Sequence, residues 1–323
     1  MASVRESDVG GRPWDTAGTV SVVVAVGVVL LLLARPSLGL ALTWDLLVPL
    51  VPLTLLVAPR LWRNLCPIAV VHQLPVRIGR GGRRRPGRAA QWWMSAASIG
   101  LLAIIVPLRL VVFNENGPAL ALFVVSVLVI ALLGGAYYAG KAGWCASLCP
   151  VLPVERLYGQ DPWGEPSHAH CSSCVGCVSA CPDLDPRASF RKATGPNVLR
   201  TPMGLFALGF PGFVAGYFLA DQPASLFAAY ALTFGGAVIS GVAFLGLIVL
   251  LRLDHGRVAR LSAAVAFGVY YWFTVPSVAA MLAGAVGVAG LPTKGILAAQ
   301  LGLIGLAFVW LTRGVRRPTR RTA

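Results

Sequence analysis

The chain has 323 residues, of which 57% are hydrophobic and only 12% are charged. Its mean hydropathy of +0.75 excludes an ordinary soluble globular protein. The net charge of +15 would suit nucleic acid, but no aromatic or folded reading module accompanies the basic stretch RIGRGGRRRPGR at 77–88. Arginines beside a membrane attract anionic lipid headgroups by about 1 kcal/mol each, so we expect the lipid bilayer as a partner and no nucleic acid.

Eight apolar segments follow one another, and each is near the roughly 20 residues that a helix needs to cross a bilayer. They run over 17–34, 40–58, 92–113, 118–139, 201–219, 227–251, 261–286 and 295–312. No small-residue cleavage site follows the first segment, so we expect a membrane helix there and no cleaved signal peptide. The pattern predicts an all-α polytopic membrane protein. We divide it into a four-helix membrane block (1–139), a polar cytoplasmic insert (140–200) and a second four-helix block with a basic tail (201–323).

The cations are unevenly distributed among the loops between these segments. If the N-terminus is cytoplasmic, all but three of the 27 Lys and Arg residues fall on the cytoplasmic side. Positive residues concentrate in cytoplasmic loops of membrane proteins. The sequence therefore predicts a multi-pass protein of the bacterial cytoplasmic (inner) membrane, with both termini and the insert in the cytoplasm.

The insert contains CSSCVGCVSACP, in which Cys171, Cys174, Cys177 and Cys181 have the spacing C-x2-C-x2-C-x3-C-P. We call these four residues the cysteine run. Their spacing is typical of a bacterial ferredoxin that binds a [4Fe–4S] cluster. A structural zinc site would separate its two cysteine pairs by a dozen residues or more, which disfavours zinc. The insert is thus predicted to be a small ferredoxin-like iron–sulfur insert, with these cysteines as its cofactor and metal ligands.

In two-cluster ferredoxins the fourth cysteine of such a run binds the other cluster, yet no cysteine follows Cys181. The remaining candidates are Cys66, Cys145 and Cys149, which we call the upstream cysteines. The segments LWRNLCP and GWCASLCP align on their Leu-Cys-Pro triplets, and each follows a predicted membrane helix. Convergence of these thiols on a second metal site is one interpretation. Inert, buried cysteines at helix ends are the other.

These motifs resemble the membrane-bound ferredoxin-type proteins of the NapH/NosR kind and the related copper reductase CcoG. The resemblance covers about residues 40–190 and rests on Cys66-Pro67, Cys145/Cys149-Pro150 and the cysteine run. It implies electron delivery at a membrane. Family members usually have two cluster motifs where this chain has one, and Trp62 replaces the leading cysteine of the first triplet motif. With seven cysteines, a non-cysteine ligand, a shared three-plus-four arrangement and a single cluster all remain open.

The four histidines, His72, His168, His170 and His255, are expected in cytoplasmic loops. Haem b in a membrane protein needs histidines that face each other within helices, so we expect none. His168 and His170 precede Cys171 and are interpreted as linker residues, with ligation or tuning of a cluster as the alternative.

Two pairs of charged residues carry further expectations. Asp45 and Arg109 are predicted to pair between neighbouring membrane helices. Asp183 and Asp185 are expected to be exposed handles for docking a partner.

The function predicted is single-electron transfer by one [4Fe–4S] cluster, with a second cluster open. The partners expected are a ferredoxin, a flavoprotein, or a reductase or oxidase subunit, with quinone as a further candidate. The protein would be an electron-transfer component of an oxidoreductase system and not a free-standing enzyme. Two alternatives remain. One is a metal-ion (copper-type) reductase or dithiol redox site at the upstream cysteines, fed by the cluster, and the other is a membrane-anchored redox sensor.

Overall fold

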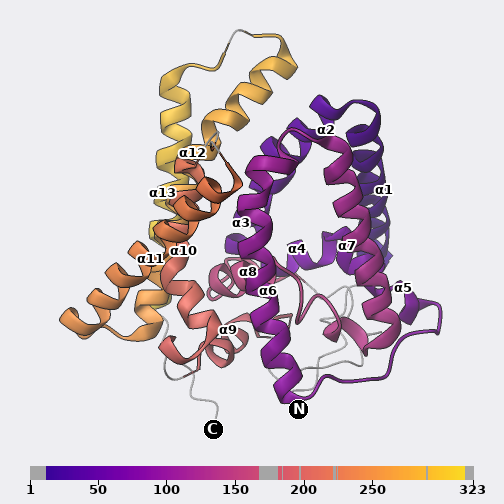
Figure 1. Ribbon diagram of the computed structural model, residues 1–323, viewed down its shortest axis with the longest axis horizontal. Helices are drawn as coiled ribbons and strands as arrows, with labels where there is room; N and C mark the ends of the chain where they lie inside the picture. The colour runs from indigo at the N-terminus through magenta and orange to yellow at the C-terminus, as the bar shows by residue number, and fades with distance from the viewer. Residues whose placement is uncertain are drawn as a thin grey trace. The chain divides into compact units, whose positions relative to one another are not determined.

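The structure is a computed structural model of the chain (Figure 1). It describes residues 12–166, 181–183, 185–195, 198–220, 223, 225–288 and 290–316. In these ranges the chain is helical, apart from turns and one isolated bridge between Arg84 and Tyr138. The predicted all-α class is therefore confirmed for the described part of the chain.

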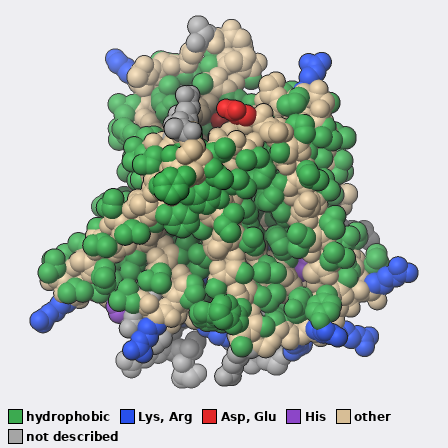
Figure 2. Space-filling model, in the orientation of Figure 1, with side chains coloured by type: hydrophobic (Ala, Val, Ile, Leu, Met, Phe, Trp, Pro, Cys, Tyr) green, Lys and Arg blue, Asp and Glu red, His purple; other side chains and the backbone are tan. Residues whose placement is uncertain are grey.

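The eight predicted membrane segments are confirmed as helices that are long and apolar enough to cross a membrane. In the described residues they span Pro13–Ala34, Pro36–Val57, Ala89–Phe113, Gly117–Tyr137, Pro202–Leu219, Leu226–Leu251, His255–Val286 and Thr293–Arg313. Hydrophobic side chains cover much of the molecular face drawn in Figure 2. An apolar exterior of this kind is stable against lipid and not against water. The chain is thus a multi-pass membrane protein.

The chain divides into two compact units. The first contains Met1–Thr43, Leu50–Ile105 and Val112–Ala193, and the second contains Trp44–Pro49, Val106–Val111 and Thr194–Ala323. The described residues of 140–193 therefore belong to the same unit as most of the N-terminal helices. The three-part division predicted from the sequence remains a prediction.

In the first unit, α1 (Arg12–Ala34) packs against α2 (Pro36–Ala41), α5 (Pro67–Arg77) and α7 (Gly117–Tyr137), as Figure 1 shows. A glycine allows the closest approach of α5 to α7. A Cβ atom on Gly135 would lie 1.8 Å from the carbonyl oxygen of His72. The remaining helices of this unit are α3 (Val48–Val57, shared with the second unit), α4 (Pro59–Leu65), α6 (Arg88–Leu108), α8 (Leu152–Tyr158) and α9 (Pro186–Thr194).

The short helices α4, α5 and α8 begin at prolines. Pro59 and Pro67 occupy the first helical turns of α4 and α5, and Pro153 does so in α8. Proline suits this position because its fixed φ is already helical and its missing N–H is not needed there. The same residue type prevents the preceding segment from continuing as a helix. Local sequence thus divides the chain into short segments beside the long helices, and the candidate site is built from them.

The second unit consists mainly of α10 (Pro202–Leu219), α11 (Leu226–Leu251), α12 (His255–Val286) and α13 (Thr293–Arg316). Helix α10 packs closely on α11, and α12 packs on α10 and α13 (Figure 1). A Cβ atom on Gly212 would lie only 1.9 Å from the carbonyl oxygen of Gly236. Small residues allow this close contact, which is a common basis of helix association in membranes.

Two π-helical segments interrupt the long helices: η2 (Leu42–Leu47) and η3 (Arg109–Phe113). They contain the two charged residues that were predicted to pair, Asp45 and Arg109. The Arg109 guanidinium lies 3.9 Å from the centre of the Trp44 ring and 5.4 Å from that of Tyr217. The arginine is thus held by aromatic faces in addition to any attraction to Asp45.

Candidate functional site

The structure describes four of the seven cysteines. Cys171, Cys174 and Cys177 lie outside the described residues, as do His168 and His170. Cys181 and the upstream cysteines are described; all four are free thiols and are only partly exposed. The candidate site can therefore be built from Cys66, Cys145, Cys149 and Cys181.

Short segments of the first unit position these four thiols. Cys66 is the junction residue between α4 and α5, in extended conformation with φ −64° and ψ 115°. Cys145 and Cys149 lie in the turns between η4 (Gly140–Ala142) and α8. The first Leu-Cys-Pro triplet therefore follows the short α4, whereas turns separate the second triplet from the membrane helix α7. The predicted attachment of both triplets directly to membrane helices is thus corrected.

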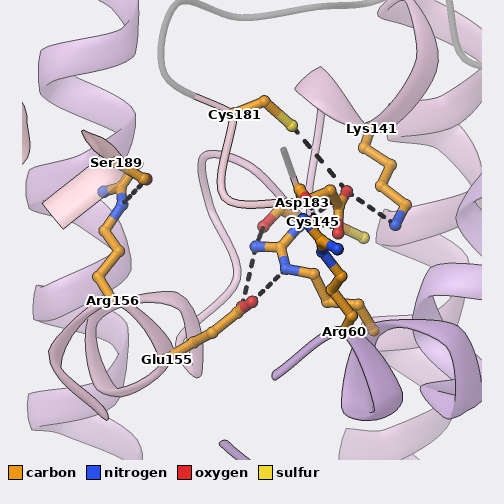
Figure 3. Close-up of polar contacts among 9 residues, drawn as sticks. Arg60, Lys141, Cys145, Glu155, Arg156, Cys181, Asp183 and Ser189 are labelled. Atoms are coloured by element: carbon orange, nitrogen blue, oxygen red, sulfur yellow. Dashed lines mark hydrogen bonds and ion pairs between the residues drawn. The ribbon is translucent and has the colours of Figure 1, made fainter. Parts of the chain in front are cut away.

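Four charged side chains are buried among these cysteine segments. Arg63 and Lys141 are each 4% exposed, Asp183 is 5% exposed and Glu155 is 6% exposed. We call these four residues the buried charge network. Figure 3 shows Lys141 and Asp183 beside Cys145 and Cys181, with Glu155 reaching toward the same centre. Such residues are almost never fully buried unless they are paired.

The members of the buried charge network are connected by direct contacts. Arg63 donates to both carboxylate oxygens of Glu155, with Nη2 at 2.8 Å from Oε2. Its Nη1 lies 3.4 Å from Oδ2 of Asp183. Lys141 Nζ donates to that same oxygen at 3.0 Å. Asp183 therefore holds two cations, and Arg63 holds two carboxylates.

Additional contacts attach this network to the surrounding segments. Arg63 Nη2 lies 3.4 Å from the backbone oxygen of Cys145. Arg60 donates from Nε to the backbone oxygen of Asp183 at 2.9 Å and pairs with Glu165 at 3.3 Å. These bonds fix the Asp183 segment from both its side chain and its backbone.

The charges of this network are maintained by pairing. Burial, the largest single effect, lowers the pKa of Lys141, but Asp183 and Cys145 together raise it above its ordinary value. Burial likewise opposes the charge of Arg63, and the two carboxylates raise the Arg63 pKa well above its ordinary value. Burying an ion costs several kcal/mol before pairing, so an apolar core would stabilise the fold as well or better. The network is therefore better explained by what it positions.

Burial disfavours the thiolate form of all four cysteines. Burial is the largest cause that raises the pKa of Cys149 and that of Cys181, each to about 12. Burial also raises the pKa of Cys66, and raises that of Cys145 well above its ordinary value. A metal that binds these thiols has to displace their protons.

The upstream cysteines lie close enough for their charges to influence one another. After burial, Cys149 and Cys66 each raise the pKa of Cys145, whereas Lys141 and Arg63 lower it. Cys66 likewise raises the pKa of Cys149.

Cys181 lies near the same two cations, which lower its pKa against the effect of burial, and its Sγ is 4.0 Å from Asp183 Oδ2. Cys145 and Cys181 are thus each influenced by both cations, whereas Cys66 is influenced by Lys141 and Cys149 by Arg63.

The described residues contain no group of three or more His, Cys, Asp or Glu side chains that could hold a single metal ion. The thiols of a cubane bind four different irons and therefore stand farther apart than four ligands of one ion.

Three interpretations drawn from the sequence are corrected by the structure. Asp183 is buried and ion-paired, so it is not an exposed docking handle. Asp185 is exposed and caps α9, where its side chain accepts a hydrogen bond of 2.7 Å from the backbone N–H of Ala188. His72 lies in α5 and not in a loop, and His255 is the first residue of α12. His72 is fully buried, and its Nδ1 lies 2.6 Å from the Ala131 carbonyl oxygen, to which it donates.

Sequence reasoning missed the buried charge network itself. One signal was present: the chain has only 12 acidic residues, and four of these lie within six positions of a cysteine. A comparison with known protein families, curated proteins and solved structures found no match. The function is therefore argued from the residues alone.

Proposed function

We propose that this protein is a membrane-anchored iron–sulfur electron-transfer protein. It would pass single electrons between a cytoplasmic ferredoxin, flavoprotein or reductase and either quinone or another redox subunit in the membrane. The observation that carries the proposal is the cysteine run, C-x2-C-x2-C-x3-C-P, in a chain with eight membrane spans. Its last member, Cys181, lies in a buried site with the upstream cysteines and two cations.

The described residues fit a [4Fe–4S] cluster by their chemistry. Such a cluster supplies one-electron redox chemistry when it is bound, and protein thiols are its usual ligands. The cations Arg63 and Lys141 would offset the negative charge that several thiolates bring into a buried site. The membrane helices would hold this redox site beside the bilayer, within reach of a lipid-soluble acceptor.

We infer the orientation in the membrane from the distribution of cations. The loops assigned to one side of the membrane carry all but three of the 27 Lys and Arg residues. That side is the cytoplasm of a bacterium under the proposal, and it includes both termini and the cysteine run. A cysteine accessibility assay on intact cells with single reporter cysteines at 35 and 294 would test this orientation, since both positions should be labelled from outside.

Iron and acid-labile sulfide counts on anaerobically purified protein, with EPR of the reduced form, test the function. The comparison is wild type against a variant with Cys171→Ala, Cys174→Ala and Cys177→Ala, and the matched control carries Ser172→Ala and Ser173→Ala in the same run. We expect iron and a reduced-state EPR signal in wild type and control, with a large loss in the cysteine variant. Wild-type protein without iron or sulfide after anaerobic purification would refute the proposal.

A dithiol redox site at the upstream cysteines is the second candidate function. The observation that favours it is the mutual influence of Cys66, Cys145 and Cys149 on their ionisation. In that case two thiols would be oxidised to a disulfide, and their two electrons and two protons would reduce a quinone to the quinol. With metal ions as acceptors, two ions would each take one electron and the two protons would pass to water. Mass spectrometry of alkylated protein would then show a reversible disulfide among these three residues.

A further inference from the structure

We propose that Cys66, Cys145, Cys149 and Cys181 together bind a [4Fe–4S] cluster of their own, positioned by the buried charge network. This site would be distinct from the cluster bound by Cys171, Cys174 and Cys177. The inference deepens the proposed function and rests on it. It assigns the ligands of a second cluster and places that cluster among the short helices beside the membrane spans.

Ligand counting gives the first argument. The first three cysteines of a ferredoxin run bind one cluster, and the fourth binds the other. Cys181 therefore needs three thiol partners from elsewhere in the chain. No cysteine follows it, and the three upstream cysteines are the remaining thiols. Each of the three is influenced by at least one of the two cations that also influence Cys181: Cys145 by both, Cys66 by Lys141 and Cys149 by Arg63.

The buried charge network gives the second argument, because every described segment that contains a proposed ligand also contributes a charged residue to it. Bonds among the four charged residues tie together three segments that are separate in sequence, 63–66, 141–155 and 181–183. The pairs are Cys66 with Arg63, Cys145 with Lys141, Cys149 with Glu155, and Cys181 with Asp183.

Backbone hydrogen bonds to sulfur give the third argument. The backbone N–H groups of Ile68 and Ala69, at the start of α5, donate to Cys66. Cys149 accepts from the backbone of Val151, and Cys181 from that of Asp183. Such bonds favour the thiolate over the thiol, and they are one of the means by which proteins tune iron–sulfur clusters. Three of the four proposed ligands thus have donors already aimed at sulfur.

The test uses full-length protein purified anaerobically in detergent and measures iron, sulfide and EPR spin count per chain. Wild type should hold about eight irons, the content of two [4Fe–4S] clusters, and show two interacting spins when fully reduced. The Cys66→Ala/Cys149→Ala variant should lose about half of the iron and one spin. A variant lacking Cys171, Cys174 and Cys177 should retain the other half. Ser147→Ala, a buried change between two of the proposed ligands, is the matched control and should keep all of the iron.

The outcomes separate this inference from the proposed function. The contrary result is a wild type that holds about four irons, all of which are lost in the variant without Cys171, Cys174 and Cys177 and none of which are lost in Cys66→Ala/Cys149→Ala. That result would overturn the second site and leave the proposed function intact. Absence of iron from wild type would overturn both. The wild-type spin count decides the matter even if the alanine variants misfold, because one spin per chain contradicts two clusters.

Discussion

Removing the carboxylate charge of Asp183 should destabilise the protein strongly, and removing Lys141 as well should restore most of the loss. Asp183 Oδ2 accepts from Lys141 Nζ at 3.0 Å and lies 3.4 Å from Arg63 Nη1. In Asp183→Asn, Arg63 still pairs with Glu155. Lys141 would then keep a buried positive charge with no other carboxylate contact in the part of the chain that the structure describes.

Breaking a buried ion pair by removing one partner costs about 3–5 kcal/mol. A change of 1 kcal/mol shifts the unfolding midpoint of a domain of 150–250 residues by about 2–4 °C. We therefore expect Asp183→Asn to lower the thermal midpoint by about 6–20 °C. The double variant Asp183→Asn/Lys141→Met removes both charges and should recover most of this loss, because the buried ammonium is gone.

The assay is thermal unfolding in detergent, followed by tryptophan fluorescence, for both single variants, the double variant and wild type. Asp185→Asn is the matched control: this residue is exposed and caps α9, and asparagine caps helices as well as aspartate. Its midpoint should therefore stay close to that of wild type. If the double variant loses the sum of the two single losses, the charges do not interact and the network described here is refuted.

Three other measurements test separate parts of the structure. Gly212→Ala should lower the thermal midpoint, because the added methyl group would lie 1.9 Å from a carbonyl oxygen of α11. Gly235→Ala is the control and should have little effect, because its methyl group would meet no atom within 4 Å. Equal midpoints for the two variants would contradict the close packing of α10 on α11. Burial lowers the pKa of His72, so this residue binds more protons in the unfolded protein than in the folded protein. The stability of the fold should therefore decrease as the pH drops below about 6.5. In pH-resolved unfolding scans, His72→Gln should flatten that dependence. Arg109→Lys should lower the free energy of unfolding by about 1–2 kcal/mol in a chemical unfolding series, because lysine loses the planar contact with the Trp44 ring. An unchanged free energy of unfolding would exclude that stacking.

Much of the fold was predictable from local properties of the sequence. A membrane helix needs only a run of about 20 apolar residues, so its position depends on composition within one segment and not on distant partners. The eight predicted segments accordingly agree with the helices of the structure within a few residues. The largest difference is at the start of α12, where prediction began at 261 and the helix begins at His255, because Asp254 caps it with its side chain.

The candidate site was predictable only in part. The cysteine run is recognisable because its chemistry depends on spacing within eleven residues. The breaks between short helices were likewise indicated by prolines such as Pro67. The burial of Asp183 was not predictable, and its assignment as a docking handle was wrong. An aspartate near a cysteine has the same local sequence whether it faces water or a buried lysine.

The sequence by itself thus determined the membrane class of this protein, the positions of its helices and the presence of a cysteine run, because each follows from short-range composition and spacing. Only the tertiary structure decided which residues meet. Arg63 and Asp183 are separated by 120 positions and have a direct contact. Packing of α4, η4 and α8 brings them, with Lys141 and Glu155, to one buried centre among four thiols. No local pattern encodes that meeting, since it depends on how distant segments pack and on the need to pair every charge that packing removes from water.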